Sequence, residues 1–232
     1  MESRPIKTAE ELLKIMKASA MGDACFEHIA GYMRAGMTEL QVADEIEATF
    51  KKLGGGKLSF PTICVSGSRS DQPHGEPSDK VIEDGDFVTM DFGTTVDGYC
   101  GDMTRTVAVG YVTDEMEKVY DIVLRAQLAG LETIKAGVPC FDVDKKVRDI
   151  IVEEGYGEYY IHGTGHGVGR EVHEKPYLNT RTDETLEADM AVTCEPGIYL
   201  PGKFGVRIED LAIVTDFGII NTVRSVKDLI II

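Results

Sequence analysis

A repeat with a constant offset is the feature that most constrains what this 232-residue chain can fold into. Residues 35–54 read AGMTELQVADEIEATFKKLG and residues 136–155 read AGVPCFDVDKKVRDIIVEEG, so every aligned pair is 101 positions apart. Both copies carry apolar residues at helical spacing and end in a glycine suited to a helix C-cap. A period this long indicates one domain over residues 1–232, built from two similar halves at about 8–110 and 114–216, and not a solenoid of short repeats.

Capping motifs predict where the first helices begin. Thr8 precedes Glu11 by three residues and Thr38 precedes Gln41 in the same way, the pattern of a capping box. A third helix is expected from about 114 to 135, because apolar residues recur there on one face. Each half is therefore predicted to consist of helices followed by a β-hairpin.

The first hairpin brings two acids together. Asp97–Gly98 is a strong two-residue hairpin turn, and it makes Asp91 the cross-strand partner of Thr104. Asp102 then becomes the diagonal neighbour of Asp91 on the same face, within reach of its side chain. We therefore expect an acid pair on one face of this hairpin.

The second hairpin is predicted to do the same. Residues 201–203, Pro-Gly-Lys, form a three-residue loop, and that loop length places Glu195 opposite Glu209. A bulge in either hairpin would shift its register by one residue. Without one, each half delivers two carboxylates to one hairpin face.

Composition narrows the class of protein. A hydrophobic content of 43% supports a sizeable core, and a net charge of −16 without a basic cluster argues against nucleic acid, which needs Lys and Arg to displace counterions. No apolar stretch is long enough to span a membrane, and the N-terminal string MESRPIK is no signal peptide. The cysteines are odd in number and form no CxxC, which is typical of reduced thiols in a cytoplasmic protein. They are Cys25, Cys64, Cys100, Cys140 and Cys194.

Four carboxylates in one pocket require cations. Bare anions repel one another and lose hydration, whereas divalent metals remove that objection. Carboxylate oxygens with one imidazole suit Mn²⁺, Co²⁺, Fe²⁺ or Zn²⁺, and four are enough to bridge two metals about 3.5–4 Å apart. Such a pair activates a shared hydroxide and polarises a carbonyl. Each acid alone would fit a surface strand, but all four fall among Val, Ile and Met.

The histidines lie near these acids in Gly- and Pro-rich segments. His166 is flanked by glycines, whose small size lets a backbone approach a crowded site, and the run does not match GxGxxG. His162 lies four residues before it, His173 seven after it, and His74 in a Pro-bounded loop. A lone histidine is usually structural, but this distribution favours imidazoles placed for proton transfer and oxyanion stabilisation.

Five ordered strings carry a family resemblance over residues 8 to 232. They are PHGEPSDK, GDFVTMDFG followed by GYCGDMTRT, HGTGHGVGREVHE, CEPGIYLPG and GVRIED. With them the chain resembles the catalytic domain of pita-bread metallopeptidases, and most closely the Xaa-Pro aminopeptidase and dipeptidase branch. The resemblance implies an α/β pita-bread fold with pseudo-twofold halves around a central antiparallel sheet.

The resemblance also implies a metal site. Asp91 would bind one metal, Asp102 and Glu209 would bridge both, and His166 with Glu195 would complete the second. The cofactors would be two divalent ions, with Mn²⁺ or Co²⁺ favoured and Zn²⁺ or Fe²⁺ as alternatives.

The remaining roles concern the substrate. Glu195 would also shuttle a proton, His173 and His162 would contact the scissile amide and the oxyanion, and His74 would line the substrate pocket. Arg207 would orient a ligand carboxylate or meet the substrate's own carboxylate. The implied activity is hydrolysis of the N-terminal bond of short peptides, ahead of proline, by a hydroxide that bridges the metals. A homodimer is left open.

Two departures and two alternatives accompany this resemblance. Xaa-Pro peptidases usually carry an N-terminal accessory domain, which we expect this chain to lack, and residues 68–72 are more polar than expected. Methionine aminopeptidase is the runner-up activity, disfavoured because such enzymes resemble Gln-x-Glu where this chain has Arg207-Ile208-Glu209. A non-catalytic peptide-binding module of the same fold, or a creatinase-like enzyme, would lack the metal ligands.

Overall fold

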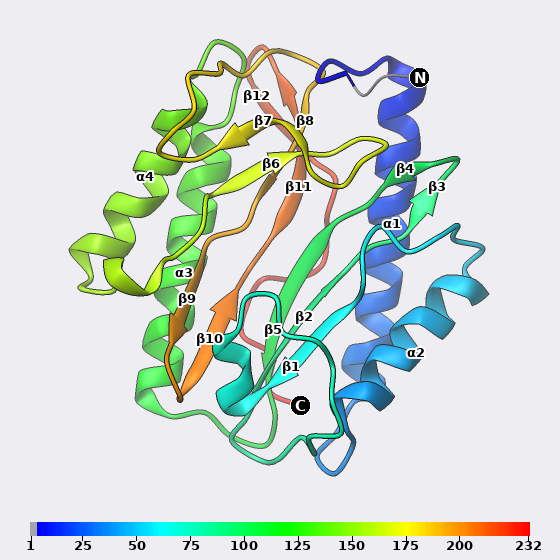
Figure 1. The fold of residues 1–232 in the computed structure, drawn as a ribbon, viewed down its shortest axis with the longest axis vertical. Helices are drawn as coiled ribbons and strands as arrows, with labels where there is room; N and C mark the ends of the chain where they lie inside the picture. Colours follow the sequence, from blue (N-terminus) through cyan, green and yellow to red (C-terminus); the bar gives the residue numbers. More distant parts are fainter. Residues whose placement is uncertain (1–3) are drawn as a thin grey trace.

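Two helix pairs flank a set of antiparallel strands in the computed structural model, which describes residues 4–232 (Figure 1). The first three residues of the N-terminal string lie outside the described part of the chain. The helices are α1 (Ala9–Tyr32), α2 (Glu39–Lys52), α3 (Asp114–Thr133) and α4 (Cys140–Glu153), with 3₁₀ turns η1 (Gly67–Asp71) and η2 (Gly157–Tyr159). The mixed α/β architecture and the helix expected from about 114 to 135 are confirmed.

The helix pairs repeat with the predicted offset. Both ends of α2 and α4 differ by 101 positions. The glycines at the matching ends share a left-handed backbone, with φ of 90° at Gly36 and 86° at Gly137, then 80° at Gly54 and 86° at Gly155. Only glycine adopts this conformation at little cost, so the repeat is present in the backbone conformation as well as in the sequence.

The predicted capping boxes close the first two helices. The Thr8 side chain accepts a hydrogen bond from the backbone N–H of Glu11, and the Glu11 side chain accepts one from the backbone N–H of Thr8. Thr38 and Gln41 make the same two bonds. These contacts satisfy backbone donors that a helix start leaves free. Each box therefore fixes where its helix begins.

Antiparallel ladders join the strands between the helices. The strands are β1 (Ile63–Ser66), β2 (Phe87–Phe92), β3 (Thr95–Val96), β4 (Tyr99–Cys100), β5 (Met103–Ala108), β6 (Gly165–Gly167), β7 (Glu174–Leu178), β8 (Ala191–Cys194), β9 (Gly197–Leu200), β10 (Phe204–Arg207), β11 (Asp210–Thr215) and β12 (Gly218–Asn221). One sheet has the order β1-β2-β5 and another β12-β11-β8-β6-β7, and the pairs β9–β10 and β3–β4 complete the hairpins.

Both predicted hairpin registers are confirmed. Asp91 pairs with Thr104 across β2 and β5, without a bulge. In the second half Gly197 pairs with Arg207, and further along Cys194 pairs with Asp210, which is the register set by the three-residue loop.

The second hairpin opens between these two ladders, at the predicted acid pair. The backbone N–H of Glu195 bonds to the carbonyl of Thr164 at 2.8 Å, and that of Glu209 bonds to Thr104 at 3.1 Å. Thr104 belongs to β5 of the first half, so this bond joins the two halves directly. The acids of both halves therefore meet where the hairpins touch.

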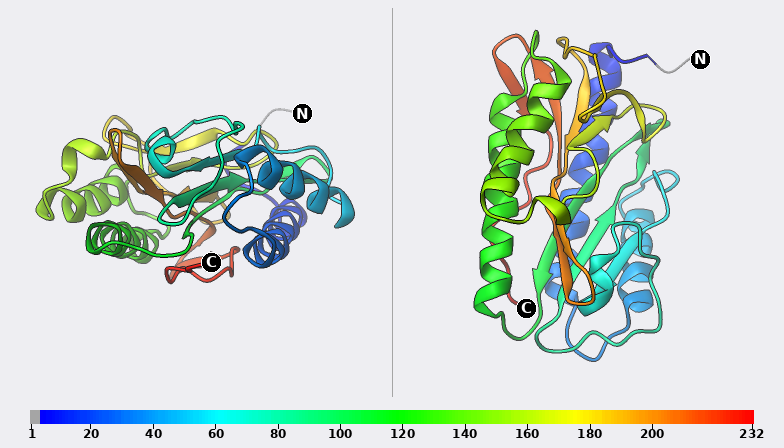
Figure 2. Two further views of the ribbon diagram at one scale, coloured as in Figure 1. Left: turned by 90° about the horizontal axis from the view of Figure 1, so that it is seen from below. Right: turned by 60° about the vertical axis from the view of Figure 1, so that its left-hand side comes forward.

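The C-terminal segment lies between α1 and α3 on the side away from α2 and α4 (Figure 2). Ser225 Oγ donates to Asp23 of α1 at 2.6 Å, and Lys227 Nζ donates to Gln127 of α3 at 3.1 Å. Arg105 of β5 is buried beside this segment and uses its five N–H groups on five oxygen acceptors, among them the carbonyl of Glu209. This network fixes β5 and the backbone of Glu209 against the C-terminal segment.

The five cysteines are free, as predicted, and all of them are buried. Burial raises the pKa of Cys25 and Cys140 to about 12, so these thiols stay protonated at neutral pH. Among residues 4–232, we find no helix with the length and apolarity needed to cross a bilayer.

Candidate active site

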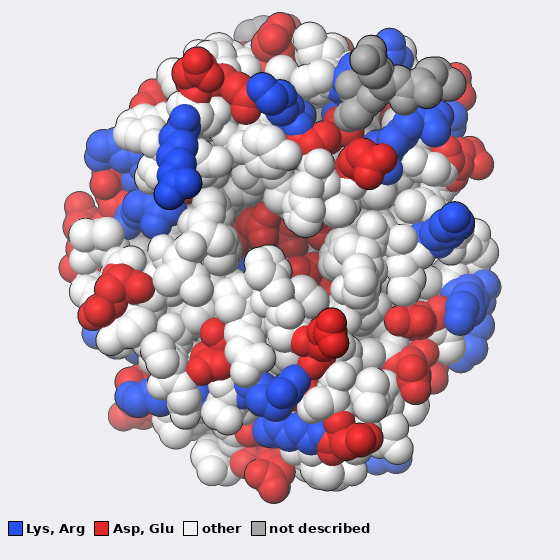
Figure 3. Space-filling model, viewed as in Figure 1, with Lys and Arg blue, Asp and Glu red and all other residues white. Residues whose placement is uncertain are grey.

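A cavity of about 450 Å³ opens in the middle of one face of the molecule. Acidic side chains lie at the bottom of this hollow, ringed by uncharged surface (Figure 3). All nine predicted site residues line the cavity: His74, Asp91, Asp102, His162, His166, His173, Glu195, Arg207 and Glu209. They come from both halves of the chain.

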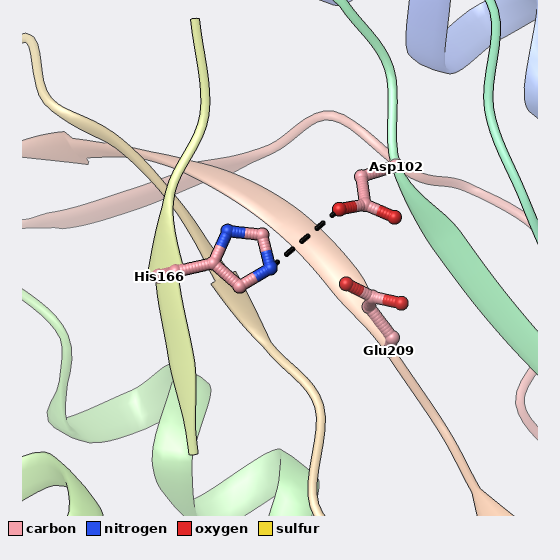
Figure 4. A group of neighbouring side chains, drawn as sticks. All are labelled: Asp102, His166 and Glu209. Carbon is pink, nitrogen blue, oxygen red and sulfur yellow. Dashed lines mark ion pairs between the residues drawn. The ribbon is translucent and has the colours of Figure 1, made fainter. Parts of the chain in front are cut away.

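Three of these side chains converge closely enough to share a cation (Figure 4). Ligand atoms of Asp102, His166 and Glu209 lie within 4.8 Å of one another, and all three residues are buried. Nε2 of His166 lies 3.7 Å from Asp102 Oδ2 and 3.2 Å from Glu195 Oε1. Its Nδ1 lies 3.1 Å from the carbonyl of Gly167, which fixes that nitrogen as a donor and leaves Nε2 facing the acids, as in metal-ligating histidines.

Asp91 completes the acid cluster and carries an unsatisfied oxygen. Its Oδ2 accepts from the Arg207 guanidinium at 2.7 Å, while its Oδ1 is buried and has no hydrogen-bond partner among the described residues. A buried carboxylate oxygen without a partner costs free energy unless a cation or donor meets it. A divalent metal fits that position.

The protonation of the cluster also favours a cation. Burial, then repulsion from neighbouring carboxylates, raises the pKa of Asp102 and Glu209 well above the ordinary range. Burial raises the pKa of Asp91 too, against the opposing charge of Arg207. Burial also acts to raise the pKa of Glu195, but His166 outweighs it and lowers that pKa to about 2. Protons would occupy the metal-free cluster, and cations are the species that can replace them.

Tyr199 links the arginine to a histidine, and sequence reasoning missed it. Its hydroxyl accepts from Arg207 at 2.8 Å and lies 2.8 Å from Nε2 of His162. Nδ1 of His162 lies 2.7 Å from the Gly163 carbonyl, so Nδ1 donates and Nε2 accepts the tyrosine proton. Burial lowers the pKa of His162, in keeping with a neutral ring. The signal was present: Tyr199 follows Glu195 by four residues, on the same face of an extended segment.

Two threonines orient the acids. Thr104 donates to Glu209 Oε2 at 2.7 Å and accepts from Nε of Arg207 at 3.1 Å. Thr193 accepts from the backbone of His166 at 3.0 Å and donates to Glu195 Oε1 at 3.1 Å. Each hydroxyl therefore fixes one oxygen of a carboxylate in the cluster.

His173 and His74 lie at the more open side of the cavity. The ring of His173 meets that of His166 edge-on, with centroids 4.3 Å apart, and burial lowers its pKa. His74 belongs to the exposed loop between η1 and β2. Both rings can therefore meet a molecule in the cavity.

The glycines around His166 permit close backbone contacts, as predicted. A Cβ at Gly165 would overlap the carbonyl oxygen of Thr193, and a Cβ at Gly167 would overlap that of Lys175. Any larger residue would push β6 away from β8 or β7.

A buried acid from the second helix of each half organises a histidine loop. Glu39 of α2 accepts from the backbone and hydroxyl of Ser66 and of Ser78, the two ends of a segment that contains η1 and His74 and is called the His74 loop below. Arg69, within that loop, also donates to Glu39 at 3.1 Å. One carboxylate thus closes the whole loop.

Asp144 of α4 does the same for the His162 segment. It accepts from the backbone and hydroxyl of Thr164 and from two nitrogens of Arg148. Arg148 in turn donates to the carbonyls of Tyr160 and His162 at 3.0 and 2.8 Å. Sequence reasoning did not find either acid, because neither lies in a recognisable motif.

Comparison with known proteins places the chain. Residues 14–216 match metallopeptidase family M24. The chain belongs to this family. Its fold is therefore the predicted pita-bread fold, and the family implies divalent metal binding.

Curated relatives that are similar in sequence include uncharacterized peptidases of two bacteria. The uncharacterized peptidase YqhT of Bacillus subtilis is 46% identical over 229 residues, covering 99% of this chain and 65% of that protein. An uncharacterized peptidase of Staphylococcus aureus is 42% identical over 215 residues, covering 93% and 61%. The chain thus spans a little under two thirds of the length of these relatives.

Solved structures agree closely with this fold. The Xaa-Pro dipeptidase from Bacillus anthracis superposes with a TM-score of 0.98 at 51% identity, over 99% of this chain and 64% of that one. The X-Pro aminopeptidase from Thermotoga maritima gives 0.96 at 41% identity, over 99% and 64%. The prolidase from Pyrococcus furiosus gives 0.95 at 41% identity, over 96% and 66%.

Proposed function

We propose that the chain is a dinuclear-metal exopeptidase that hydrolyses the N-terminal bond of short peptides, ahead of proline. The observation that carries this proposal is the convergence of four carboxylates and one imidazole, from both halves, in one cavity. The M24 match and the Xaa-Pro peptidases among its structural neighbours support it.

The ligand set follows from the donor atoms. Asp91 would hold one metal through its unpartnered Oδ1, Asp102 and Glu209 would bridge, and His166 with Glu195 would hold the second. Two divalent cations, when bound, make water a nucleophile at neutral pH and polarise the scissile carbonyl. Arg207 would keep Asp91 ionised and aligned, since four of its five N–H groups already bond to protein.

The protein's own acids and bases handle the protons. The Glu195 side chain reaches the cavity, so its carboxylate would accept a proton there and return it to the leaving amine. His173 has no hydrogen bond among the described residues, so its ring is the freer donor for the oxyanion. His162 reaches substrate only by exchanging its bond to Tyr199, and His74 lines the pocket wall.

We also propose which metals the site binds and in which compartment the protein acts. Mn²⁺ or Co²⁺ suits this oxygen-rich set best, with Zn²⁺ or Fe²⁺ as alternatives. Free, buried cysteines fit a reducing compartment, so we place the chain in the cytoplasm, acting as one catalytic domain. A homodimer stays a prediction, which light scattering would test.

A side-by-side assay tests the activity. Metal-free protein receives Mn²⁺, Co²⁺ or Zn²⁺, and cleavage of Ala-Pro, Ala-Pro-Ala and Met-Ala-Ser is compared at equal concentration. We expect release of the first residue from the proline peptides and little from Met-Ala-Ser. Preferential cleavage of Met-Ala-Ser would favour a methionine aminopeptidase, and failure with every peptide and metal would contradict the proposal.

A further inference from the structure

A second cavity adjoins the candidate active site. It has a volume of about 460 Å³ and shares His162, Gly163 and Asn179 with the first cavity. Its lining contains Arg148 and Arg181 and no acidic side chain, although the whole chain carries a net charge of −16. Arg148 is paired with buried Asp144, so the charge that attracts an anion to this cavity is that of Arg181.

Arg148 forms the fixed wall of this cavity. Its guanidinium bonds to Asp144 and to two backbone carbonyls, and it stacks on the Tyr160 ring at 4.2 Å from the centroid. These contacts use four of its five N–H groups, since each oxygen takes one. One N–H of a rigid guanidinium is left for a ligand.

Arg181 supplies the free charge. Its side chain is exposed and forms no ion pair within residues 4–232, whereas its backbone N–H donates to Asn179 Oδ1 at 2.8 Å. That bond fixes the Asn179 amide so that its Nδ2 remains a donor where the two cavities meet. Ile161, 64% exposed, adds an apolar surface beside these donors.

We propose that this cavity, the arginine subsite, binds a carboxylate of a peptide whose N-terminal residues occupy the candidate active site. The inference rests on the proposed function and extends it to substrate class: peptides longer than two residues that carry a carboxylate beyond the scissile bond. An extended chain advances about 3.3 Å per residue, so a few residues carry its end from one cavity into the next. Guanidinium groups match carboxylates geometrically, and amide and hydroxyl donors complete the site.

Matched peptides test the arginine subsite. Ala-Pro, Ala-Pro-Ala and Ala-Pro-Ala-Ala are compared as free acids and as C-terminal amides. The C-terminal amide of Ala-Pro-Ala-Glu is added, because its one carboxylate is the glutamate side chain. For wild-type protein we expect the KM of at least one of the longer free acids, Ala-Pro-Ala or Ala-Pro-Ala-Ala, to lie about threefold to tenfold below the KM of the matching amide. Arg181→Gln should remove this difference and leave kcat and the Ala-Pro reaction unchanged. If the glutamate peptide regains the advantage, a side-chain carboxylate serves as well as a chain end.

Arg34→Gln is the control, because Arg34 is exposed on the turn after α1 and outside both cavities. If Arg34→Gln lost the difference in KM between acids and amides as fully as Arg181→Gln, the effect would be one of general charge and the proposal would be overturned. Identical KM values for the acids and amides of wild-type protein would overturn it as well. Calorimetry measures the binding of the same peptides to metal-free protein and so separates recognition from turnover. It gives the ratio of the affinities for acid and amide. That ratio decides the subsite even if no peptide is cleaved.

Discussion

Glu209 lies where the two halves of the chain contact each other. Thr104 donates to one of its oxygens, its backbone bonds across to β5, and its side chain is buried beside Asp102. A glutamine has the same shape but lacks the charge that two cations require. Its amide nitrogen would also face the cluster as a donor where the site needs acceptors.

Glu209→Gln should therefore lose metal and activity together. We expect the bound metal, measured by mass spectrometry after dialysis, to fall well below that of wild type, with no measurable peptide cleavage. Glu187→Gln, which neutralises an exposed glutamate, serves as the control and should behave as wild type. A fully active, metal-replete Glu209→Gln protein would remove this residue from the ligand set.

His173→Ala separates catalysis from metal binding. His173 packs edge-on against His166 but has no bond to the acids, so its loss should leave metal content intact. We expect kcat to fall by about 100-fold, the usual cost of losing an oxyanion donor or acid–base group. The comparison variant is His28→Ala, whose imidazole pairs with Glu45 on the surface. Unchanged kcat in His173→Ala would exclude the residue from the mechanism.

At the scale of elements, turn chemistry explains why the registers could be predicted. Asp97 and Gly98 both have positive φ, 51° and 80°, as a two-residue hairpin turn requires. Once the turn is fixed, period-two alternation fixes every partner, including Asp91 opposite Thr104. The same logic gave the second hairpin, because its loop length sets the pairing.

The contacts between halves could not be predicted from the sequence. The second hairpin opens at Glu195 and Glu209 because each backbone finds a partner in another segment, and such pairing depends on how the halves dock. Asp144 acts through the same long-range packing, and it is an ordinary residue in its local pattern. Local propensity and spacing carry no signal for such contacts.

Asp144 offers a test at this scale. Asp144→Asn keeps the volume but turns one acceptor into a donor against Thr164 and Arg148, in a site without exposure to solvent. We expect a loss of about 2–4 kcal/mol in the free energy of unfolding, measured in urea, since a buried charge pair is broken. The His162 segment should loosen with it, so kcat/KM should fall while metal content holds.

The control for this variant lies on the same helix. Asp149 forms an exposed pair with Lys145 four residues before it, and Asp149→Asn should leave the urea midpoint unchanged. Were both variants equally stable, the buried acid would contribute nothing beyond a surface pair.

At the scale of the whole molecule, the candidate metal site is the joint between the two predicted halves of the chain. Asp91 and Asp102 come from the first half, and His166, Glu195 and Glu209 from the second. A cation held by both would favour the docked, folded state over the unfolded chain, in which the ligands are far apart. Metal affinity then appears as folding stability.

Metal should accordingly raise the melting temperature of the whole chain in one cooperative step. At a free Mn²⁺ concentration of 100 times Kd the gain is about 2.7 kcal/mol, which corresponds to about 5–10 °C for a chain of this size. Differential scanning calorimetry of metal-free protein with and without Mn²⁺ measures it. Mg²⁺, which retains its water and binds imidazole poorly, should shift the transition less. Because Glu209 and its hydrogen bond to Thr104 lie at the joint itself, Glu209→Gln should melt at a temperature independent of Mn²⁺. An equal upward shift in that variant would mean that the cation binds elsewhere, and the halves would then be held together by their packing alone.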